Sequence, residues 1–198
     1  MLCGDGFVGA GKQKKQLMIE YPDLLEEINK IDPTQPICLA IDGVAGSGKT
    51  TLASKLCDDL KNCQVVHMDD LYEGWNDPIS QRLTTRVIRE LLAPFSEQIS
   101  VRYQKFNWAL NKFDKFINLG VPNRLILEGV GAGQREFRKY FSKIIWVEYD
   151  PQQGFDRVIA RDGEGIKEEM KNFLIDQNKH FNAELTKNAA DYIISGAP

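Results

Sequence analysis

Residues 37–60 read ICLAIDGVAGSGKTTLASKLCDDL, and this stretch decides the fold. It opens with the apolar run ICLAI at 37–41, which predicts a strand, and closes with a helical pattern at 51–60. Between them, Gly43 to Thr50 fits the pattern GxxxxGK[ST]. Glycines let backbone N–H groups turn inward around a phosphate, and the N-terminus of the following helix adds its positive end. The stretch therefore predicts a phosphate-binding loop between a strand and a helix.

The motif predicts a role for each polar residue of the loop. Lys49 is expected to reach the β- and γ-phosphates of a nucleotide, and the hydroxyl of Thr50 to take one position on Mg²⁺. The rest of the predicted nucleotide site consists of Gly43, Ala45, Gly46, Ser47, Gly48 and Thr51.

Weaker patterns of the same kind occur elsewhere in the chain. Residues 4–12 repeat the glycine and lysine spacing, but Gln13 stands where Mg²⁺ needs a hydroxyl, so we interpret them as a flexible N-terminus. The tetrads NKID at 29–32 and NKFD at 111–114 match a guanine-reading pattern. The first precedes the phosphate-binding loop, and the second is expected to follow no strand of its own. ATP is therefore the expected donor rather than GTP.

The chain has 198 residues, which suits one domain, and its formal net charge is −3. That charge argues against non-specific binding to nucleic acid or anionic membranes. No apolar run approaches membrane-spanning length. The four cysteines of the chain show no metal-ligand spacing, and we interpret them as reduced thiols: Cys3, Cys38, Cys57 and Cys63. We therefore expect a cytoplasmic protein whose partner is a small molecule; the oligomeric state stays open.

Further apolar runs complete a sheet. They are continuous rather than alternating, which is typical of parallel strands covered on both faces. With residues 37–41, the predicted strands are 64–68, 124–130, 143–149 and 191–196. Helical patterns fill the gaps at 51–60, 79–91, 151–162 and 164–188, and Pro22 opens a short helix. The pattern predicts a three-layer α/β fold with a five-stranded, mainly parallel sheet.

Two units are expected along the chain. Residues 1–36 read as an N-terminal extension whose short helix packs on the domain. Residues 37–198 read as the phosphate-binding domain itself.

Carboxylates lie where two of the predicted strands end. Asp69 and Asp70 follow the second strand, and Glu128 lies at the end of the third. In a parallel sheet such positions gather beside the phosphate-binding loop. Phosphoryl transfer to a hydroxyl often needs a carboxylate to accept the proton, and acids to hold Mg²⁺. The alternative is that Asp69 and Asp70 simply cap the next segment. His67 is expected to be a buried, hydrogen-bonded side chain.

These residues belong to a longer series of motifs, and with them the sequence resembles the uridine kinase-like branch of the P-loop nucleoside kinases, in the P-loop NTPase superfamily. The motifs are GVAGSGKTT (43–51), MDDLY (68–72), YQKFNW (103–108), LILEGV (125–130), RVIARD (157–162) and ADYIISG (190–196). The resemblance implies that Asp69 is the acceptor base and a neighbour of Mg²⁺, and that Glu128 completes the metal site. It also implies that Arg157 and Arg161 belong to a helical lid, about residues 153–170, that closes on the phosphates.

The chain departs from that branch in the acceptor region. Uridine kinases continue with a Tyr-Asp-Phe segment and a downstream histidine, whereas residues 106–108 read FNW and no histidine follows before His180. Uridine therefore does not carry over as the substrate. An aromatic acceptor wall is suggested by Asp70, Tyr72, Trp75, Tyr103, Phe106 and Trp108, with core or lid packing of the aromatics as the alternative.

Three arginines follow at helical spacing. Arg82, Arg86 and Arg89 share one helix face, which favours a solvated face, with a clamp for a phosphorylated acceptor as the alternative.

The sequence thus predicts a kinase that uses Lys49, Asp69 and Arg161 to move the γ-phosphoryl of ATP onto a hydroxyl of a nucleoside-like acceptor. Two alternatives stay open. One is a kinase of a nucleoside monophosphate, a sugar or another small metabolite. The other is a regulatory ATP-binding protein or ATPase. Whether Asp69 or Asp70 is the base also stays open.

Overall fold

The structure, a computed structural model, describes residues 17–196 and contains a six-stranded parallel sheet. The strand order is β1-β8-β7-β2-β6-β3. The strands are β1 (Leu17–Met18), β2 (Ile37–Gly43), β3 (Cys63–His67), β6 (Arg124–Glu128), β7 (Lys143–Glu148) and β8 (Tyr192–Ser195). All five predicted strands are present and parallel, and the two-residue β1 extends the sheet beyond β8. The glycine-rich stretch at 4–12 and Cys3 lie outside the described residues.

Helices connect the strands in the places that the sequence predicts. They are α1 (Tyr21–Asn29), α2 (Lys49–Leu60), α3 (Gln81–Val87), α4 (Ala93–Ser96), α5 (Pro151–Asp162), α6 (Lys167–Glu184) and α7 (Thr186–Ala189). A π-helical turn, Ile88–Leu92, joins α3 to α4. The predicted helix at 164–188 is divided, because Leu185 takes the left-handed conformation with φ 52°. No helix within residues 17–196 is long and apolar enough to cross a membrane.

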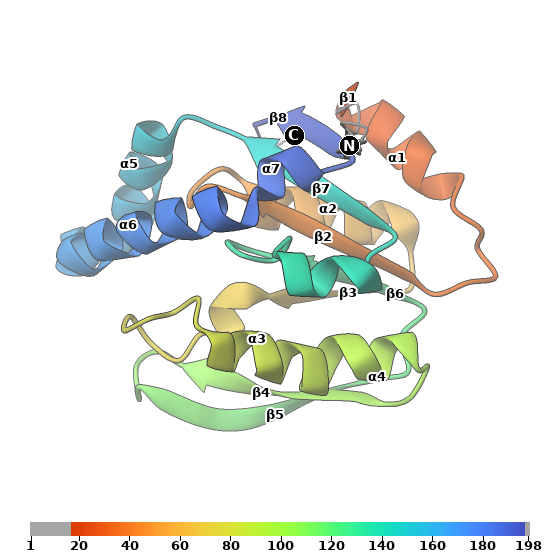
Figure 1. The fold of residues 1–198 in the computed structure, drawn as a ribbon, viewed down its shortest axis with the longest axis horizontal. Helices are drawn as coiled ribbons and strands as arrows, with labels where there is room; N and C mark the ends of the chain where they lie inside the picture. The colour runs from red at the N-terminus through yellow and green to blue at the C-terminus, as the bar shows by residue number, and fades with distance from the viewer. Residues whose placement is uncertain (1–16, 197–198) are drawn as a thin grey trace, which may run out of the picture.

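The side chains of the central strand β2 divide the core into two layers. Leu39 and Ile41 pack with Leu52 and Leu56 of α2 on one face of the sheet, where α1 also packs. Cys38, one position out of phase with them, packs on the opposite face together with residues of α3, α5 and α6. Alternation along an extended strand produces this division. The predicted three-layer α/β architecture is confirmed (Figure 1).

An antiparallel hairpin forms a second, separate sheet that the sequence did not predict. It consists of β4 (Val101–Asn107) and β5 (Lys112–Gly120). Figure 1 shows it against α3 and α4, at the margin of the molecule away from the parallel sheet. The expectation that NKFD follows no strand is wrong, since only the turn residues 108–111 separate β4 from β5, and residues 112–114 of this tetrad begin β5. Asn111 makes the reversal with φ 48°, a left-handed conformation that asparagine tolerates.

Candidate active site

The phosphate-binding loop joins β2 to α2, as the motif predicts. Gly46 and Gly48 have φ values of 74° and 97°, where side chains with a Cβ are strained. Lys49 is buried, and its Nζ donates to the carbonyl oxygen of Val44 at 2.8 Å. Burial lowers the pKa of Lys49, while the negative charges of Glu128 and Asp42 oppose that shift. The lysine is therefore folded back over the loop, close to the carboxylates.

Two later helices support this loop, and neither contact was predicted. The backbone N–H of Ala45 donates to Gln177 Oε1 of α6 at 2.8 Å. Gly154 of α5 lies so close to the loop that a Cβ on it would stand 2.3 Å from the Ala45 carbonyl oxygen. A Cβ on Gly46 would in turn stand 2.1 Å from the Gly154 carbonyl oxygen. The loop conformation therefore depends on α5 and α6 as well as on its own glycines.

Asp42, also missed by the sequence reasoning, ties the loop to the segment that follows β6. Its carboxylate is fully buried and accepts hydrogen bonds from the backbone N–H groups of Gly43 at 2.8 Å, Gly131 at 3.1 Å and Gly133 at 2.8 Å. Burial raises the pKa of Asp42 to about 6, although the three N–H groups and Lys49 act in the opposite direction.

The predicted carboxylates meet beside the loop. Asp69 lies in a 3₁₀ turn, Met68–Asp70, directly after β3, and Glu128 is the last residue of the neighbouring strand β6. Both line one cleft with Lys49 and Thr50. The Asp69 side chain is exposed to the solvent that fills this cleft, although protein groups surround it on most sides. Loss of hydration and then the charge of Glu128 raise the pKa of Asp69, against the opposing charges of Lys49 and Arg161.

Glu128 is the centre of a small polar network. Thr50 Oγ1 donates to Glu128 Oε1 at 3.0 Å, and His67 Nδ1 lies 2.5 Å from the same oxygen. The expected hydrogen bond of His67 is present, although the side chain is half-buried rather than buried. The bond to Glu128 raises the pKa of His67.

The chemistry of these side chains fits a magnesium ion. Thr50, Asp69 and Glu128 offer oxygen donors on one cleft. Within residues 17–196, no group of three histidine, cysteine or acidic side chains is close enough to hold a metal by itself. Mg²⁺ usually keeps several waters and shares one or two carboxylates with substrate phosphates, so it does not need such a cage.

Beyond the carboxylates the cleft has an aromatic wall. The whole cleft has a volume of about 530 Å³. Trp75 and Trp108 lie with ring centroids 5.0 Å apart, and Trp75 also contacts the ring of Phe173 at 6.3 Å. The lining residues are mostly apolar at this end: Tyr72, Trp75, Trp108, Val130, Val158, Ile166, Met170 and Phe173. The cleft thus joins a charged end at the loop to an apolar end at the two tryptophans.

Several predicted site residues lie elsewhere. Tyr103 and Phe106 are each 4% exposed, belong to the packing of the hairpin and do not line the cleft. Phe106 instead packs edge to face against Trp108, with ring centroids 5.3 Å apart. Arg157 lies over the ring of Tyr149, 4.2 Å from its centroid, whereas Arg161 does line the cleft. The guanidinium of Arg161 bonds Asp162 at 2.7 Å.

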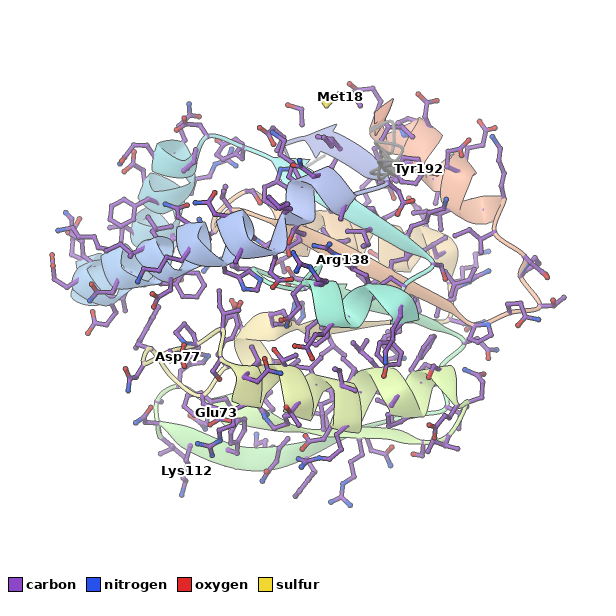
Figure 2. All side chains as sticks on the ribbon, viewed as in Figure 1. Met18, Glu73, Asp77, Lys112, Arg138 and Tyr192 are labelled. Carbon is purple, nitrogen blue, oxygen red and sulfur yellow. The ribbon has the colours of Figure 1, made fainter. Side chains whose placement is uncertain are left out.

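The arginine face of α3 is engaged with protein groups. Arg82 and Arg86 both pair with Glu73, which Figure 2 shows at the N-terminal end of α3. Arg86 also donates to the carbonyl oxygen of Leu71, and its guanidinium lies 4.1 Å from the ring centroid of Phe113. Its side chain is only 11% exposed, so the expectation of a solvated face does not describe Arg86.

Comparison with known proteins gives the same picture of the fold. A uridine kinase of Lactobacillus johnsonii is 25% identical over 81% of this chain and 86% of its own length. A solved structure described as a possible uridine kinase from Bacillus stearothermophilus superposes with a TM-score of 0.63 at 20% identity, covering 88% of this chain and 96% of that one. A candidate fructose transport system kinase from Silicibacter sp. TM1040 superposes with a TM-score of 0.60 at 19% identity, covering 88% and 98%.

The sequence match and the structural superposition both confirm the resemblance to uridine kinase-like P-loop kinases. The family model described as an AAA domain matches residues 39–179, which is more than half of the chain. The chain therefore belongs to the AAA domain family of P-loop proteins.

Proposed function

We propose that this protein is an ATP-dependent kinase that transfers the γ-phosphoryl group to a hydroxyl of a small, nucleoside-like acceptor. One observation carries the proposal. Lys49 and Thr50 of the phosphate-binding loop share a single cleft with Asp69 and with an aromatic wall. A donor phosphate at the loop and a ring-bearing acceptor at the wall would meet at Asp69.

The donor end uses the loop residues that the motif assigns. Lys49 leaves the Val44 carbonyl and reaches the β- and γ-phosphates, with the loop backbone around them. Thr50, Glu128 and Asp69 would hold Mg²⁺, which would supply positive charge to offset that of the phosphate oxygens. Arg161 releases Asp162 to offset charge on the transferred group.

The acceptor end uses Asp69 to take the hydroxyl proton. Asp69 lines the same cleft as the phosphate-binding loop and the aromatic wall, so its carboxylate faces the space that an acceptor hydroxyl would occupy. Most of the rate enhancement comes from positioning and from fixed charges, as is general for phosphoryl transfer.

A lid formed by about residues 153–170 would enclose the reactants. This range runs from α5 through Gly163, whose φ of 93° ends the helix, to the start of α6. It contributes Val158, Arg161, Ile166 and Met170 to the cleft wall. Arg157 would have to leave the ring of Tyr149 to reach the phosphates.

The arginine contacts favour an acceptor without a phosphate. Arg82 and Arg86 are paired with Glu73, and Arg86 also holds the Leu71 carbonyl. A nucleoside monophosphate would need an available guanidinium to pair with its phosphate. The named uridine kinase relative supports a nucleoside, although residues 106–108 differ from that branch.

The test is a screen for acceptor-dependent ATP consumption with nucleosides, nucleotides and sugars, using Lys49→Ala as the blank. We expect at least one uncharged ring-bearing acceptor to drive turnover. With that acceptor, Asp69→Asn should keep ATP affinity and lose on the order of 10²–10⁴ in kcat, the usual contribution of a positioned base.

Asp70→Asn is the matched control, since Asp70 lines the same cleft but pairs with Lys105. A large loss of kcat in Asp70→Asn with a mild loss in Asp69→Asn would make Asp70 the base instead of Asp69. Nucleotide hydrolysis that no acceptor stimulates would overturn the kinase proposal in favour of a regulatory ATPase.

A further inference from the structure

Three consecutive residues of the turn that contains Asp69 are held from outside the parallel sheet. The Asp69 carbonyl oxygen accepts from Trp108 Nε1 at 2.9 Å, and Asp70 Oδ1 pairs with Lys105 Nζ at 2.8 Å. The next carbonyl, that of Leu71, accepts from Arg86. Trp108 and Lys105 belong to the hairpin region of 101–120. The hairpin therefore supports the turn on which the proposed base lies.

Of the three side chains that donate to this turn, Trp108 is the one that also lines the cleft. It comes directly after β4. Its indole ring packs edge to face against the ring of Phe106 and also contacts the ring of Trp75. Trp75 and Trp108 remain 36% and 38% exposed, which is unusual for indole rings. Exposed aromatic surface within a cleft is typical of a ligand-binding wall.

We propose that Trp108 is a positioning residue for Asp69 and also the residue that selects the acceptor, by packing with Trp75 against a flat, uncharged group. The inference rests on the proposed kinase function. The indole N–H fixes the Asp69 carbonyl and with it the backbone torsions that aim the carboxylate. The same indole ring forms the acceptor wall, so acceptor binding and base orientation depend on one side chain.

The chemistry of the wall supports an uncharged group. Phe173 contacts Trp75, and Met170 and Ile166 are further apolar residues that line the same cleft. The nearby cations are matched by acids, since Lys105 pairs with Asp70 and Arg161 with Asp162. Burying a further charge here without a partner would be costly.

The two roles separate in two variants. Trp108→Phe keeps an aromatic ring but loses the N–H, so we expect kcat to fall about 10-fold with the acceptor KM within about 2-fold, because small misplacements of a reacting group are expensive. Trp108→Leu loses both features, so the acceptor KM should also rise about 10-fold, the usual scale of stacking on an aromatic side chain. The acceptor used is the one with the highest kcat/KM in the screen.

Trp146→Phe is the matched control. Trp146 also donates its N–H to a protein oxygen, Glu148 Oε2 at 2.6 Å, and it also packs on an aromatic ring, but it belongs to a separate core cluster. Rates are expressed per nucleotide-binding site, counted by titration with ATP, so that unfolded protein does not count as slow enzyme. We expect Trp146→Phe to keep both kcat and KM.

The outcomes distinguish this inference from the proposed function. A wild-type chain that turns over an acceptor while Trp108→Phe keeps its full kcat would overturn the positioning role and leave the kinase intact. An unchanged acceptor KM in Trp108→Leu would overturn the selecting role. A wild-type chain that no acceptor stimulates would overturn the kinase proposal, and this inference with it.

Discussion

Gly154 shows how a single atom can be excluded by tertiary structure. It lies within α5, where alanine is ordinarily the better helix former by about 1 kcal/mol. Yet its Cα faces the phosphate-binding loop, and a Cβ would come 2.3 Å from the Ala45 carbonyl oxygen. The two nearest atoms belong to the backbone of Ala45, so no flexible side chain can move aside to relieve the contact. Close packing therefore outweighs helix propensity at this position.

Gly154→Ala is accordingly expected to destabilise the protein by about 1–3 kcal/mol, the usual cost of overpacking, and to weaken ATP binding by displacing the loop. Urea unfolding and ATP titration measure the two effects. Gly165→Ala is the control, since a Cβ on Gly165 would meet nothing within 4 Å. A Gly154→Ala variant as stable as the wild type would show that the loop can move away at little cost.

Residues whose roles depend on local pattern could be predicted from the sequence. Lys49 and Thr50 follow from the motif, and the placement of Asp69 and Glu128 in one cleft follows from the ends of parallel strands. Gln177 could not be predicted in this way. Its contact with Ala45 spans 132 positions, and nothing in a helical pattern shows which polar residue will be turned inward.

At the scale of elements, the β4–β5 hairpin is the part of the fold that sequence reasoning missed. Its segments, VRYQKFN and KFDKFINLG, are rich in aromatic and charged residues rather than continuously apolar. A search for buried parallel strands passes over them, although the alternation of Val101 and Tyr103 with the polar Arg102 and Gln104 is a strand signal of another kind. The sequence therefore leaves open whether the aromatic residues of this region form an acceptor wall or pack in the core. In the structure Trp108 lines the cleft, whereas Tyr103 and Phe106 are buried.

Arg86 connects α3 to the hairpin and to the turn after β3. It donates to the Leu71 carbonyl, pairs with Glu73 and stacks on Phe113. Arg86→Ala would leave a carbonyl without its charged donor and remove the stacking, so we expect a loss of about 2–3 kcal/mol in the free energy of unfolding.

Arg82→Ala is the matched control for Arg86→Ala, because Arg82 lies on the same helix and pairs with the same Glu73 but is 83% exposed. It should leave the urea midpoint unchanged. An Arg86→Ala variant that unfolds like the wild type but loses affinity for a phosphorylated acceptor would contradict the structural role and restore the phosphate-clamp alternative.

At the scale of the whole molecule, the parallel sheet brings the ends of β2, β3 and β6 together, and this places the phosphate-binding loop beside the carboxylates. The continuous apolar runs made that arrangement predictable. The interior polar network that joins the strand ends was not, because Asp42 looks like one more loop residue in the sequence. In the structure it is fully buried and accepts hydrogen bonds from the N–H groups of Gly43 in the phosphate-binding loop and Gly133 in the segment after β6.

This buried carboxyl gives the folding equilibrium a pH dependence of defined sign. The pKa of Asp42 is raised from 3.8 to about 6 in the folded protein, because burial disfavours the charge. Below about pH 4 the group is protonated in both the folded and the unfolded states, and its ionisation costs nothing. As the pH rises from about 4 to about 6 the unfolded state ionises first, so the folded state loses relative stability, by roughly 3 kcal/mol for two pKa units.

Asp42→Asn cannot ionise, so it isolates this effect from the other titrating groups. The amide loses part of the hydrogen bonding to Gly43, Gly131 and Gly133, but that cost is the same at every pH. We therefore expect the stability advantage of the wild type over Asp42→Asn to shrink between pH 4 and pH 6 and to be constant above about pH 7. Urea unfolding of both proteins without nucleotide, at half-unit steps of pH, measures it. A difference that stays flat across this range, or that grows with pH, would mean that the three N–H groups hold Asp42 ionised and outweigh its burial.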